Sequence, residues 1–518
     1  PKLSRTLLFL GLLKIAAGYH ILCVFPVPSR SHNLLGKGVV DALLDAGHQV
    51  TWATPYPNIL SKNLQKNLKI IDVSGTLKFA TANMTDKKNT DKGLSFVKQF
   101  SLNITKEVMA TPAVKEILTK GRFDAVFTEE FFSDVQAGFA GVLQVPWILL
   151  HGMTLTPNHE AQLDEVRSIS TVPVLFNDCS IPMSFKDRLL NTFIYLGITL
   201  GSWIERSSTV DLYHSLYGPL AKIRGTELPP FADAFHNVSI LFVNSHESIA
   251  PAFSTPPNVI NIAGYHIAKD VPPLPKDLQE LLDNSPQGVV YFSMGSVVKS
   301  SSLPERTRND LLKQFSQLKQ TVLWKFEDKI EGLPSNVHIK SWMPQPSILA
   351  HPNVRVFITH GGLLSTLEAI NAGVPLLAVP VFGDQPANAI RATRAGYARR
   401  VSFSEDMAEE LGKELKVMLE TDRYSKRVKY LSKLFRSRPT PPAKLIPYYV
   451  ELAIESKGAY HLRSVSHQYA WYERWMLDQA ACVLLLLTVI IKLLKILLGK
   501  LFGASPKKVV KDKKKKNK

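Results

Sequence analysis

One stretch of this sequence decides the fold of the second half of the chain: Ile358-Thr359-His360-Gly361-Gly362-Leu363-Leu364-Ser365-Thr366-Leu367-Glu368-Ala369. The apolar run Val354–Ile358 that leads into it is typical of a buried strand, two glycines mark a turn, and the following residues are typical of a helix. A strand that passes through a turn into a helix is the repeating unit of parallel α/β sheets. Such a helix start carries free backbone N–H groups and a positive dipole, which predicts a binding site for a pyrophosphate.

The side chains near this turn suit the parts of a ligand that would surround a pyrophosphate. His360 can donate a hydrogen bond to a phosphate oxygen, and the two glycines permit close approach of the backbone. Glu368, one turn into the predicted helix, can accept hydrogen bonds from ribose hydroxyls. Asp384 and Gln385, at the end of the next predicted strand, offer acceptors and a donor to a polar sugar. Each residue alone has an ordinary structural explanation, but their order and spacing together favour a binding site.

The rest of the chain repeats the strand–helix alternation. Two series of short apolar runs are separated by segments of helical length, which predicts two parallel α/β halves of the Rossmann type. A ligand is expected in the cleft between the halves, at the carboxyl ends of the strands. The predicted strands are Ile21–Phe25, Gln49–Ala53, Ala125–Thr128, Trp147–Leu150 and Ile240–Asn244 in the first half, and Val289–Phe292, Thr321–Phe326, Val354–Ile358 and Leu376–Val379 in the second.

Several common ligand motifs are absent from the sequence. No GxGxxG follows the first predicted strand and no GxxxxGK[ST] occurs, so neither a dinucleotide cofactor nor P-loop chemistry is supported. A DxD pair, which some glycosyltransferases use to hold a divalent metal, is also absent. The three cysteines, Cys23, Cys179 and Cys482, have no metal-ligand spacing. We therefore expect chemistry without a metal.

The net charge of +18 does not indicate a nucleic-acid partner. Residues 507–518 hold eight lysines and one aspartate, so much of the excess belongs to a tail, and no basic stretch in the body is interleaved with aromatic residues. With 518 residues, of which 45% are hydrophobic and 20% charged, the chain is long and apolar enough for two globular domains.

The two ends of the chain predict a secretory protein with a membrane anchor. Residues 1–18 have the basic, apolar and small-residue order of a signal peptide. Leu477–Leu498 is long enough to cross a bilayer, and the lysine-rich tail at 499–518 would face the cytosol, leaving the preceding residues luminal. The final Lys515-Lys516-Asn517-Lys518 matches a dilysine pattern for retrieval to the endoplasmic reticulum. Three sequons, at Asn83, Asn103 and Asn237, lie in the predicted luminal part.

The stretch Trp342–Asn388, with His360-Gly361-Gly362-Leu363-Leu364-Ser365-Thr366 at its centre, resembles the signature of the UDP-glycosyltransferase superfamily and is most similar to its insect members. The similarity extends through Val289–Ser296, Val322–Phe326 and Lys457–Arg463, and through both termini. This resemblance implies a GT-B fold, an α/β architecture of two Rossmann-like domains that face a cleft. The C-terminal domain would bind the UDP-sugar and the N-terminal domain the acceptor.

The resemblance also implies roles for the donor residues. The uracil would contact Trp342 and Gln345, and the ribose would contact Glu368. The transferred sugar would contact Asp384 and Gln385. Leu364 departs from the asparagine that is common in plant and vertebrate members. The diphosphate would contact His360, Gly362, Ser365 and the turn formed by Gly295 and Ser296.

His32, in the loop after the first strand, is the predicted general base. A histidine there has a pKa near the working pH and can take a proton from an acceptor hydroxyl, and it matches the catalytic histidine of the family. Such a base needs a carboxylate to orient its ring. The family has Asp where this chain has Glu129, and Asp134 follows five residues later. The sequence favours Asp134, as the shorter and more rigid side chain, and keeps Glu129 as its rival.

These observations together predict a membrane-anchored enzyme of the endoplasmic reticulum. It would transfer a hexose from a UDP-sugar, with UDP-glucose preferred over UDP-glucuronic acid, to a hydroxyl of a small lipophilic acceptor, with inversion, for conjugation and detoxification. An apolar patch, Leu189–Ile204, would line the acceptor pocket, lie on the membrane or form an ordinary buried helix. The alternatives are an inactive binding protein, suggested by Glu129, and a transferase for lipid-linked or protein acceptors. Self-association into a homo-oligomer is left open.

The predicted organisation has seven parts. They are a signal peptide (1–18), an acceptor domain (19–250), a linker (251–275), a UDP-sugar domain (276–440), a helical segment that returns to the first domain (441–476), a transmembrane helix (477–498) and a cytosolic tail (499–518).

Overall fold

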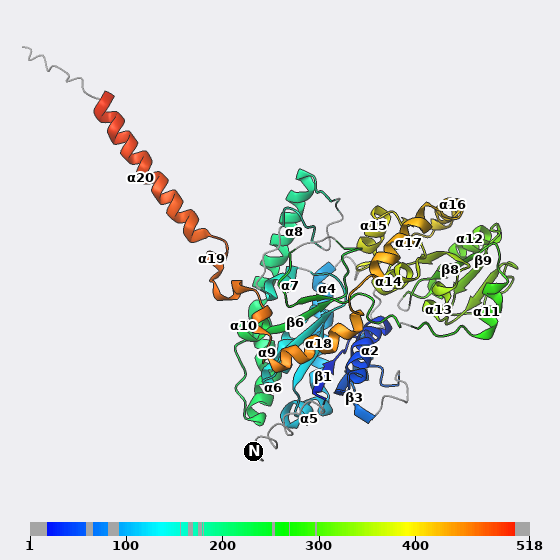
Figure 1. Cartoon of the computed structure of the whole chain (residues 1–518), viewed down its shortest axis with the longest axis horizontal. Helices are drawn as coiled ribbons and strands as arrows, with labels where there is room; N and C mark the ends of the chain where they lie inside the picture. The colour runs from blue at the N-terminus through cyan, green and yellow to red at the C-terminus, as the bar shows by residue number, and fades with distance from the viewer. Residues whose placement is uncertain are drawn as a thin grey trace, which may run out of the picture. The chain divides into compact units, whose positions relative to one another are not determined.

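The computed structural model (Figure 1) describes residues 18–58, 66–80, 93–155, 157–163, 169–174, 179, 181–250, 254–268, 270–295 and 298–502. It divides after Arg463 into a large unit and a C-terminal unit that begins at Ser464. The large unit holds two parallel sheets, each covered by helices on both faces. The predicted GT-B class is therefore confirmed.

The first sheet has seven parallel strands in the order β3-β2-β1-β4-β5-β6-β7. Its central strands are apolar at nearly every position because both faces are buried. Successive residues of a strand point to opposite faces, so Leu22 and Val126 join one core cluster while Cys23 and Phe127 join the other. The strands are β1 (His20–Val24), β2 (Gln49–Thr54), β3 (Leu68–Asp72), β4 (Ala125–Glu130), β5 (Trp147–His151), β6 (Val238–Val243) and β7 (Val259–Asn261).

The second sheet has six parallel strands in the order β10-β9-β8-β11-β12-β13. Phe292 and Ile358 face one core cluster, and their neighbours Tyr291 and Phe357 face the other. The strands are β8 (Val289–Ser293), β9 (Thr321–Lys325), β10 (Val337–Lys340), β11 (Val354–Thr359), β12 (Leu376–Ala378) and β13 (Ala398–Arg400).

The helices of the large unit cover these sheets and connect their strands. In the first half they are α2 (Arg30–Asp45), α4 (Gly93–Ala110), α5 (Pro112–Lys120), α6 (Ala137–Leu143), α7 (Pro157–Gln162), α8 (Phe185–Ile204), α9 (Arg206–Arg224) and α10 (Phe231–His236), with the 3-10 turns η2 (Ser74–Phe79) and η3 (Asp134–Gln136). In the second half they are α11 (Lys276–Asp283), α12 (Glu305–Ser316), α13 (Gln345–Ala350), α14 (Leu363–Ala372), α15 (Gln385–Arg394), α16 (Met407–Glu420), α17 (Arg423–Arg436) and α18 (Pro442–Glu455), with η4 (Ser300–Ser302) and η5 (Tyr460–Leu462).

Two segments pack with the first half although they lie beyond its predicted end at residue 250. Strand β7 lies inside the predicted linker but pairs with β6, so the first sheet extends to Asn261. Helix α18 follows the second sheet in sequence, yet its residues Ile446 and Val450 pack with α2 into a core cluster of the first sheet. Helix α18 therefore links the end of the second half to the first half.

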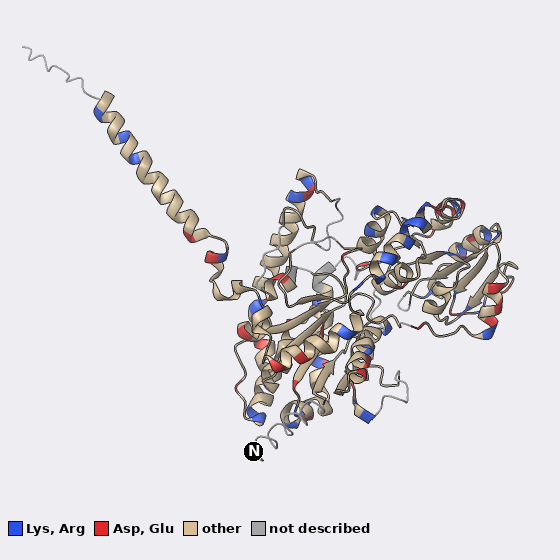
Figure 2. Cartoon of the chain, viewed as in Figure 1, with Lys and Arg blue, Asp and Glu red and all other residues tan. Residues whose placement is uncertain are grey.

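The C-terminal unit contains η6 (Val465–Gln468), α19 (Trp471–Arg474) and the long helix α20 (Leu477–Phe502). Helix α20 has a mean hydropathy of 2.7 over its most apolar window and is long and apolar enough to cross a membrane. Figure 2 shows a long uncharged stretch in this helix, with charged residues toward its ends. The predicted signal peptide, apart from Gly18, and the lysine tail after Phe502 lie outside the described residues.

Candidate functional site

The turn between β11 and α14 is built around the ring of His360. Gly361 has φ of +80°, a left-handed conformation that glycine adopts without strain, and Gly362 is the N-cap of α14. A Cβ added to Gly295 would lie 2.5 Å from the His360 ring, and one added to Gly362 would lie 2.6 Å from it. Both glycines are therefore needed to hold the ring beside the helix start. The neighbouring Ser296 lies outside the described residues.

Electrostatics keep His360 neutral at physiological pH. Burial lowers the pKa of His360 to about 4, and the positive charge of Lys325 adds to this shift. A neutral imidazole can still donate a hydrogen bond to a phosphate oxygen. Lys325 donates to the carbonyl of Gly295 at 2.9 Å and to Glu327 at 2.8 Å. The sequence gave Lys325 no role because it lies inside a predicted strand. The structure places it at the end of β9, with its cation beside the turn at Gly295.

A hydrogen-bonded group of polar side chains lies one turn further along α14. The amide nitrogen of Gln345 donates to Ser365 Oγ at 3.0 Å and to Glu368 Oε2 at 2.7 Å. Burial raises the pKa of Glu368 to about 7, although the bond from Gln345 opposes this shift. Trp342 is 62% exposed, so its ring face is open to a ligand. The structure thus brings together Gln345, Ser365 and Glu368, which the sequence had assigned to three parts of one nucleotide.

The residues predicted to contact the sugar lie at the start of α15. The amide nitrogen of Asn388 donates to Asp384 Oδ2 at 2.6 Å and to the carbonyl of Gly361 at 3.1 Å, so it links the start of α15 to the turn between β11 and α14. Burial raises the pKa of Asp384. The side-chain oxygen of Gln385 accepts from the backbone N–H groups of Val381 and Phe382, at 2.9 and 3.1 Å. That oxygen shapes the loop, a role that sequence reasoning did not assign.

The N-terminal half presents a histidine–carboxylate pair. His32 lies in the first turn of α2, and its Nδ1 contacts Oε1 of Glu129 at the end of β4. Burial of His32 disfavours its charged form, but the Glu129 carboxylate outweighs this effect, and Asp384 adds to it, so the pKa of His32 is raised. The edge of the ring also contacts Phe131, with ring centroids 4.8 Å apart. The effect of Asp384 on the pKa of His32 shows that Asp384, at the start of α15 in the second half, acts electrostatically on the histidine of the first half.

Strand pairing explains why Glu129 contacts the histidine. β4 lies beside β1 in parallel register, with Thr128 opposite Val24, so the ends of both strands meet at one edge. The loop after β1 leads directly to His32, and Glu129 is the next residue along β4. Asp134, which the sequence favoured as the partner, begins η3 beyond the turn and is half-buried. The carboxylate that the structure joins to His32 is thus the one that the sequence kept as the rival.

A family model described as UDP-glucoronosyl and UDP-glucosyl transferase matches residues 21–516 of the chain. The chain belongs to this family. UDP-glucosyltransferase 2 of Dactylopius coccus is 31% identical over 91% of this chain and 91% of its own length. UDP-glucuronosyltransferase 2B14 of Oryctolagus cuniculus is 29% identical over 75% of this chain and 73% of its own length. The resemblance inferred from the sequence motif is confirmed.

Solved structures agree on the fold of this UDP-glycosyltransferase. The calicheamicin glycosyltransferase CalG4 covers 84% of this chain with a TM-score of 0.56 and 17% identity, and 99% of that structure is matched. A UDP-glucosyltransferase from Polygonum tinctorium covers 85% of this chain with a TM-score of 0.55 and 18% identity, and is itself matched over 100%. The chain is therefore a GT-B glycosyltransferase that transfers a sugar from a UDP-sugar donor to an acceptor.

The raised pKa of Glu368 predicts that one substitution will stabilise the ligand-free enzyme and weaken its binding of UDP. Its folded-state pKa of about 7 exceeds the ordinary value of 4.5, so the ligand-free enzyme should lose stability as pH rises from about 4.5 through 7. Glu368→Gln mimics the protonated form and should stabilise the ligand-free enzyme at pH 8 by about 1–3 kcal/mol. The same change should weaken UDP binding by about tenfold, because a charged acceptor is lost.

Denaturation at pH 5 and pH 8, with calorimetry of UDP binding, checks this prediction. Glu420→Gln, at an exposed position on α16, is the matched control and should change neither quantity. A Glu368→Gln enzyme that binds UDP with unchanged affinity would remove Glu368 from the donor site.

Proposed function

We propose that this enzyme transfers glucose from UDP-glucose to a hydroxyl of a small lipophilic acceptor by a single displacement with inversion. The observation that carries the proposal is the His32–Glu129 pair. When the Nδ1–H of His32 donates to the Glu129 carboxylate, the lone pair on Nε2 is left to act as a base. That arrangement is the one that nucleophile activation by a histidine requires.

The reaction follows from the positions of these groups. Nε2 of His32 takes the acceptor proton while the acceptor oxygen forms a bond to the anomeric carbon, and the bond from that carbon to the UDP oxygen breaks. Glu129 stabilises the imidazolium that results. The leaving diphosphate gains negative charge, which we expect the amino end of α14 and the His360 side chain to stabilise, with Lys325, paired with Glu327, beside the same turn. In this mechanism no metal ion is needed at the diphosphate.

The contact between Glu129 and His32 favours an active enzyme over an inactive binding protein. The replacement of the usual Asp by Glu129 suggested the inactive alternative, but the longer side chain still reaches the ring. The sequence also has all of the predicted donor residues of the second half, and all of them except Ser296 lie among the described residues.

Glucose is the preferred donor sugar because of the charge around it. Asp384 is an acceptor for neutral sugar hydroxyls, whereas a glucuronate carboxylate would meet a second carboxylate there. The similarity to UDP-glucosyltransferase 2 of Dactylopius coccus also supports glucose.

Two apolar helices support a lipophilic acceptor and a membrane location. Helix α8 exposes Phe185, Phe193 and Trp203, at 73%, 64% and 70%, which suits contact with a membrane surface or with apolar acceptors. Helix α20 would anchor the chain in the endoplasmic reticulum, with residues before Leu477 in the lumen. Phenols, flavonoids, steroids and foreign compounds are the proposed acceptors, and detoxification is the proposed role.

A donor and acceptor screen tests the proposed function. Purified full-length enzyme would be mixed with UDP-glucose, UDP-glucuronic acid or other UDP-sugars and a panel of phenols, flavonoids and steroids, and UDP release would be measured. We expect the fastest acceptor-dependent release with UDP-glucose. Release that is independent of every acceptor would contradict the assignment to small lipophilic acceptors.

Protease protection gives the prediction for topology. In sealed microsomes, added protease should remove only the extreme C-terminus, because the body of the protein is proposed to be luminal and the lysine tail cytosolic. Detergent should make the body accessible. Digestion of the body without detergent would show the opposite orientation.

A luminal body also predicts glycosylation. Asn103 and Asn237, the two sequons among the described residues, should carry glycan, which an endoglycosidase mobility shift measures.

A further inference from the structure

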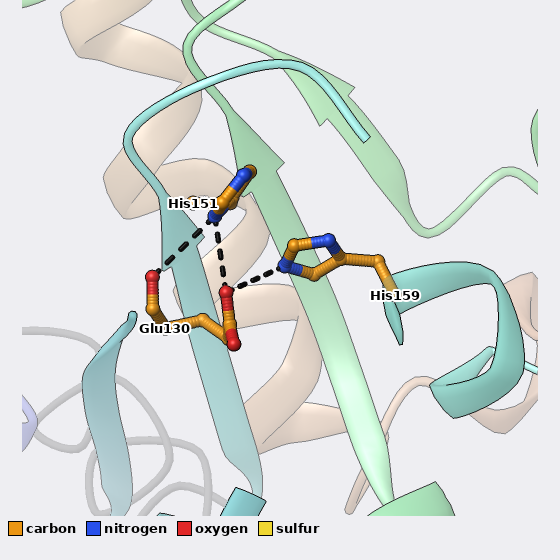
Figure 3. Close-up of side chains that lie close together, drawn as sticks. All are labelled: Glu130, His151 and His159. Carbon is orange, nitrogen blue, oxygen red and sulfur yellow. Dashed lines mark hydrogen bonds and ion pairs between the residues drawn. The ribbon is translucent and has the colours of Figure 1, made fainter. Parts of the chain in front are cut away.

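A second polar cluster lies in the N-terminal half, formed by Glu130, His151 and His159 (Figure 3). Oε2 of Glu130 lies 2.8 Å from Nε2 of His159 and 3.1 Å from Nδ1 of His151. The three side chains are 4%, 1% and 0% exposed. Such burial is costly for ionisable groups, so a specific role for the cluster is expected.

The sheet brings these residues together. Glu130 is the last residue of β4 and lies directly opposite His151, the last residue of β5. His159 follows from α7, which begins shortly after β5. Because successive strand residues point to opposite faces, Glu130 is directed away from the pair formed by Glu129 and His32. The cluster is therefore separate from the proposed base, although it lies at the same carboxyl edge of the sheet.

The backbone next to the cluster fixes the Glu130 carboxylate. Phe132 has φ of +55°, an uncommon left-handed conformation for a residue with a bulky side chain. In this conformation its backbone N–H donates to Oε1 of Glu130 at 2.8 Å, which leaves Oε2 directed at the two imidazoles. Strain of this kind, which orients a side chain through a second hydrogen bond, is typical of a ligand site.

Hydrogen bonding alone leaves the cluster incomplete. Nδ1 of His151 faces two oxygens, Oε2 and the backbone carbonyl of Glu130, the latter at 3.4 Å. Its other nitrogen, Nε2, is buried with no hydrogen-bond partner among the described residues, a state that costs about 1–3 kcal/mol. A cation bound to Nδ1 of His151 would leave Nε2 with the ring proton, so the unpaired Nε2 is not by itself the argument for a cation. That argument is that two buried ring nitrogens, Nδ1 of His151 and Nε2 of His159, converge on the single oxygen Oε2 of Glu130.

We infer that Glu130, His151 and His159 form a binding site for a divalent transition-metal ion, with zinc as the best fit. Two imidazole nitrogens and one carboxylate oxygen are a ligand set that zinc accepts, and the three atoms lie within 4.8 Å of one another. Ligand distances of about 2.0–2.2 Å to the metal would require the present contacts to widen by a few tenths of an ångström. His159, on the short helix α7, is the ligand whose movement would allow this.

We expect the effect of the ion to be structural, with a small ligand such as water completing the coordination by three protein side chains. It joins the ends of β4 and β5 to α7, and so it holds the segment after β5 against the carboxyl edge of the sheet, where the acceptor is proposed to bind. The proposed diphosphate site lies in the other half of the large unit, so we expect metal binding here to leave the donor chemistry unchanged.

Metal titration of the full-length enzyme in detergent tests the inference. After treatment with a chelator and its removal, we expect one zinc ion to bind per chain and to raise the unfolding temperature. Cobalt should bind in its place and give the intense visible absorption of a four- or five-coordinate ion, whereas loosely bound cobalt in water absorbs weakly. UDP affinity, measured in parallel, should be the same with and without metal.

Variants locate the ion. Glu130→Gln and His159→Gln keep hydrogen-bonding groups at both positions, and each should weaken zinc binding by about a hundredfold or more. His214→Ala, which removes an exposed histidine of α9, is the matched control and should bind zinc as the unaltered chain does. UDP binding by each variant shows that it is folded. Zinc or cobalt binding that is absent from the unaltered chain, or unchanged in both cluster variants, would overturn the inference, and the cobalt spectrum of the unaltered chain decides the matter even where a variant fails to fold.

Discussion

His32→Ala is expected to lower kcat by about a hundredfold or more, while the affinity for UDP stays the same. The reason is that Nε2 of His32 is proposed to remove the acceptor proton, whereas the donor is proposed to bind residues of the second half. The loss should therefore appear in the chemical step. Turnover of a phenolic acceptor and calorimetry of UDP binding measure the two quantities separately.

His214→Ala provides the control for this experiment because it removes an exposed histidine far along the sequence, on α9. It should retain the rate of the unaltered enzyme. If His32→Ala also keeps nearly full activity, the base lies elsewhere and the proposed mechanism is wrong. A chelator should leave UDP affinity unchanged, because the amino end of α14 and His360 are proposed to carry the diphosphate charge.

Glu129→Gln is expected to lower kcat by about tenfold to a hundredfold and to move the acid side of the pH–rate profile to lower pH. The Glu129 carboxylate is the main cause of the raised pKa of His32. A base with a raised pKa is protonated, and therefore inactive, at higher pH. Removing the negative charge should lower that pKa, so the neutral base persists further into acid while its reactivity falls.

Asp134→Asn tests which of the two candidate carboxylates, Glu129 or Asp134, orients the His32 ring. We expect it to change kcat by less than about threefold and to leave the acid side of the profile in place, since Glu129 is the residue in contact with the ring. The opposite result, with a large fall for Asp134→Asn and a small one for Glu129→Gln, would assign the orienting role to Asp134. The pH profile matters because a purely structural effect would not shift it.

The strands that the sequence did not predict are the four edge strands of the two sheets. β3, β7, β10 and β13 were not predicted, whereas all nine strands between them were. Central strands are buried on both faces and therefore appear as continuous apolar runs. An edge strand is partly exposed and carries polar residues, as in Val337-His338-Ile339-Lys340, so its pattern resembles that of a loop. This is also why the first sheet was expected to end before β7.

The grouping of the predicted donor residues in space was easier to predict from the sequence than the carboxylate partner of His32. His360, Ser365 and Glu368 follow one another along a single turn and helix, so local spacing places them on the same ligand. The choice between Glu129 and Asp134 depends on how β4 lies beside β1, which is a contact between distant parts of the chain. The tie from Asn388 to Gly361 is likewise a contact across 27 positions that spacing alone does not reveal.

Leu364 sets a condition for exchanging domains between relatives. It belongs to α14, the helix at the phosphate site, yet it packs against the apolar cluster formed by the first sheet, α2 and α18. A hybrid enzyme that takes its second half from a relative with asparagine at this position would place an amide against that cluster, at a cost of about 1–3 kcal/mol. A hybrid that takes its acceptor domain from one relative should therefore also take helix α18 and the residue at position 364 from that relative, because both pack against the first sheet.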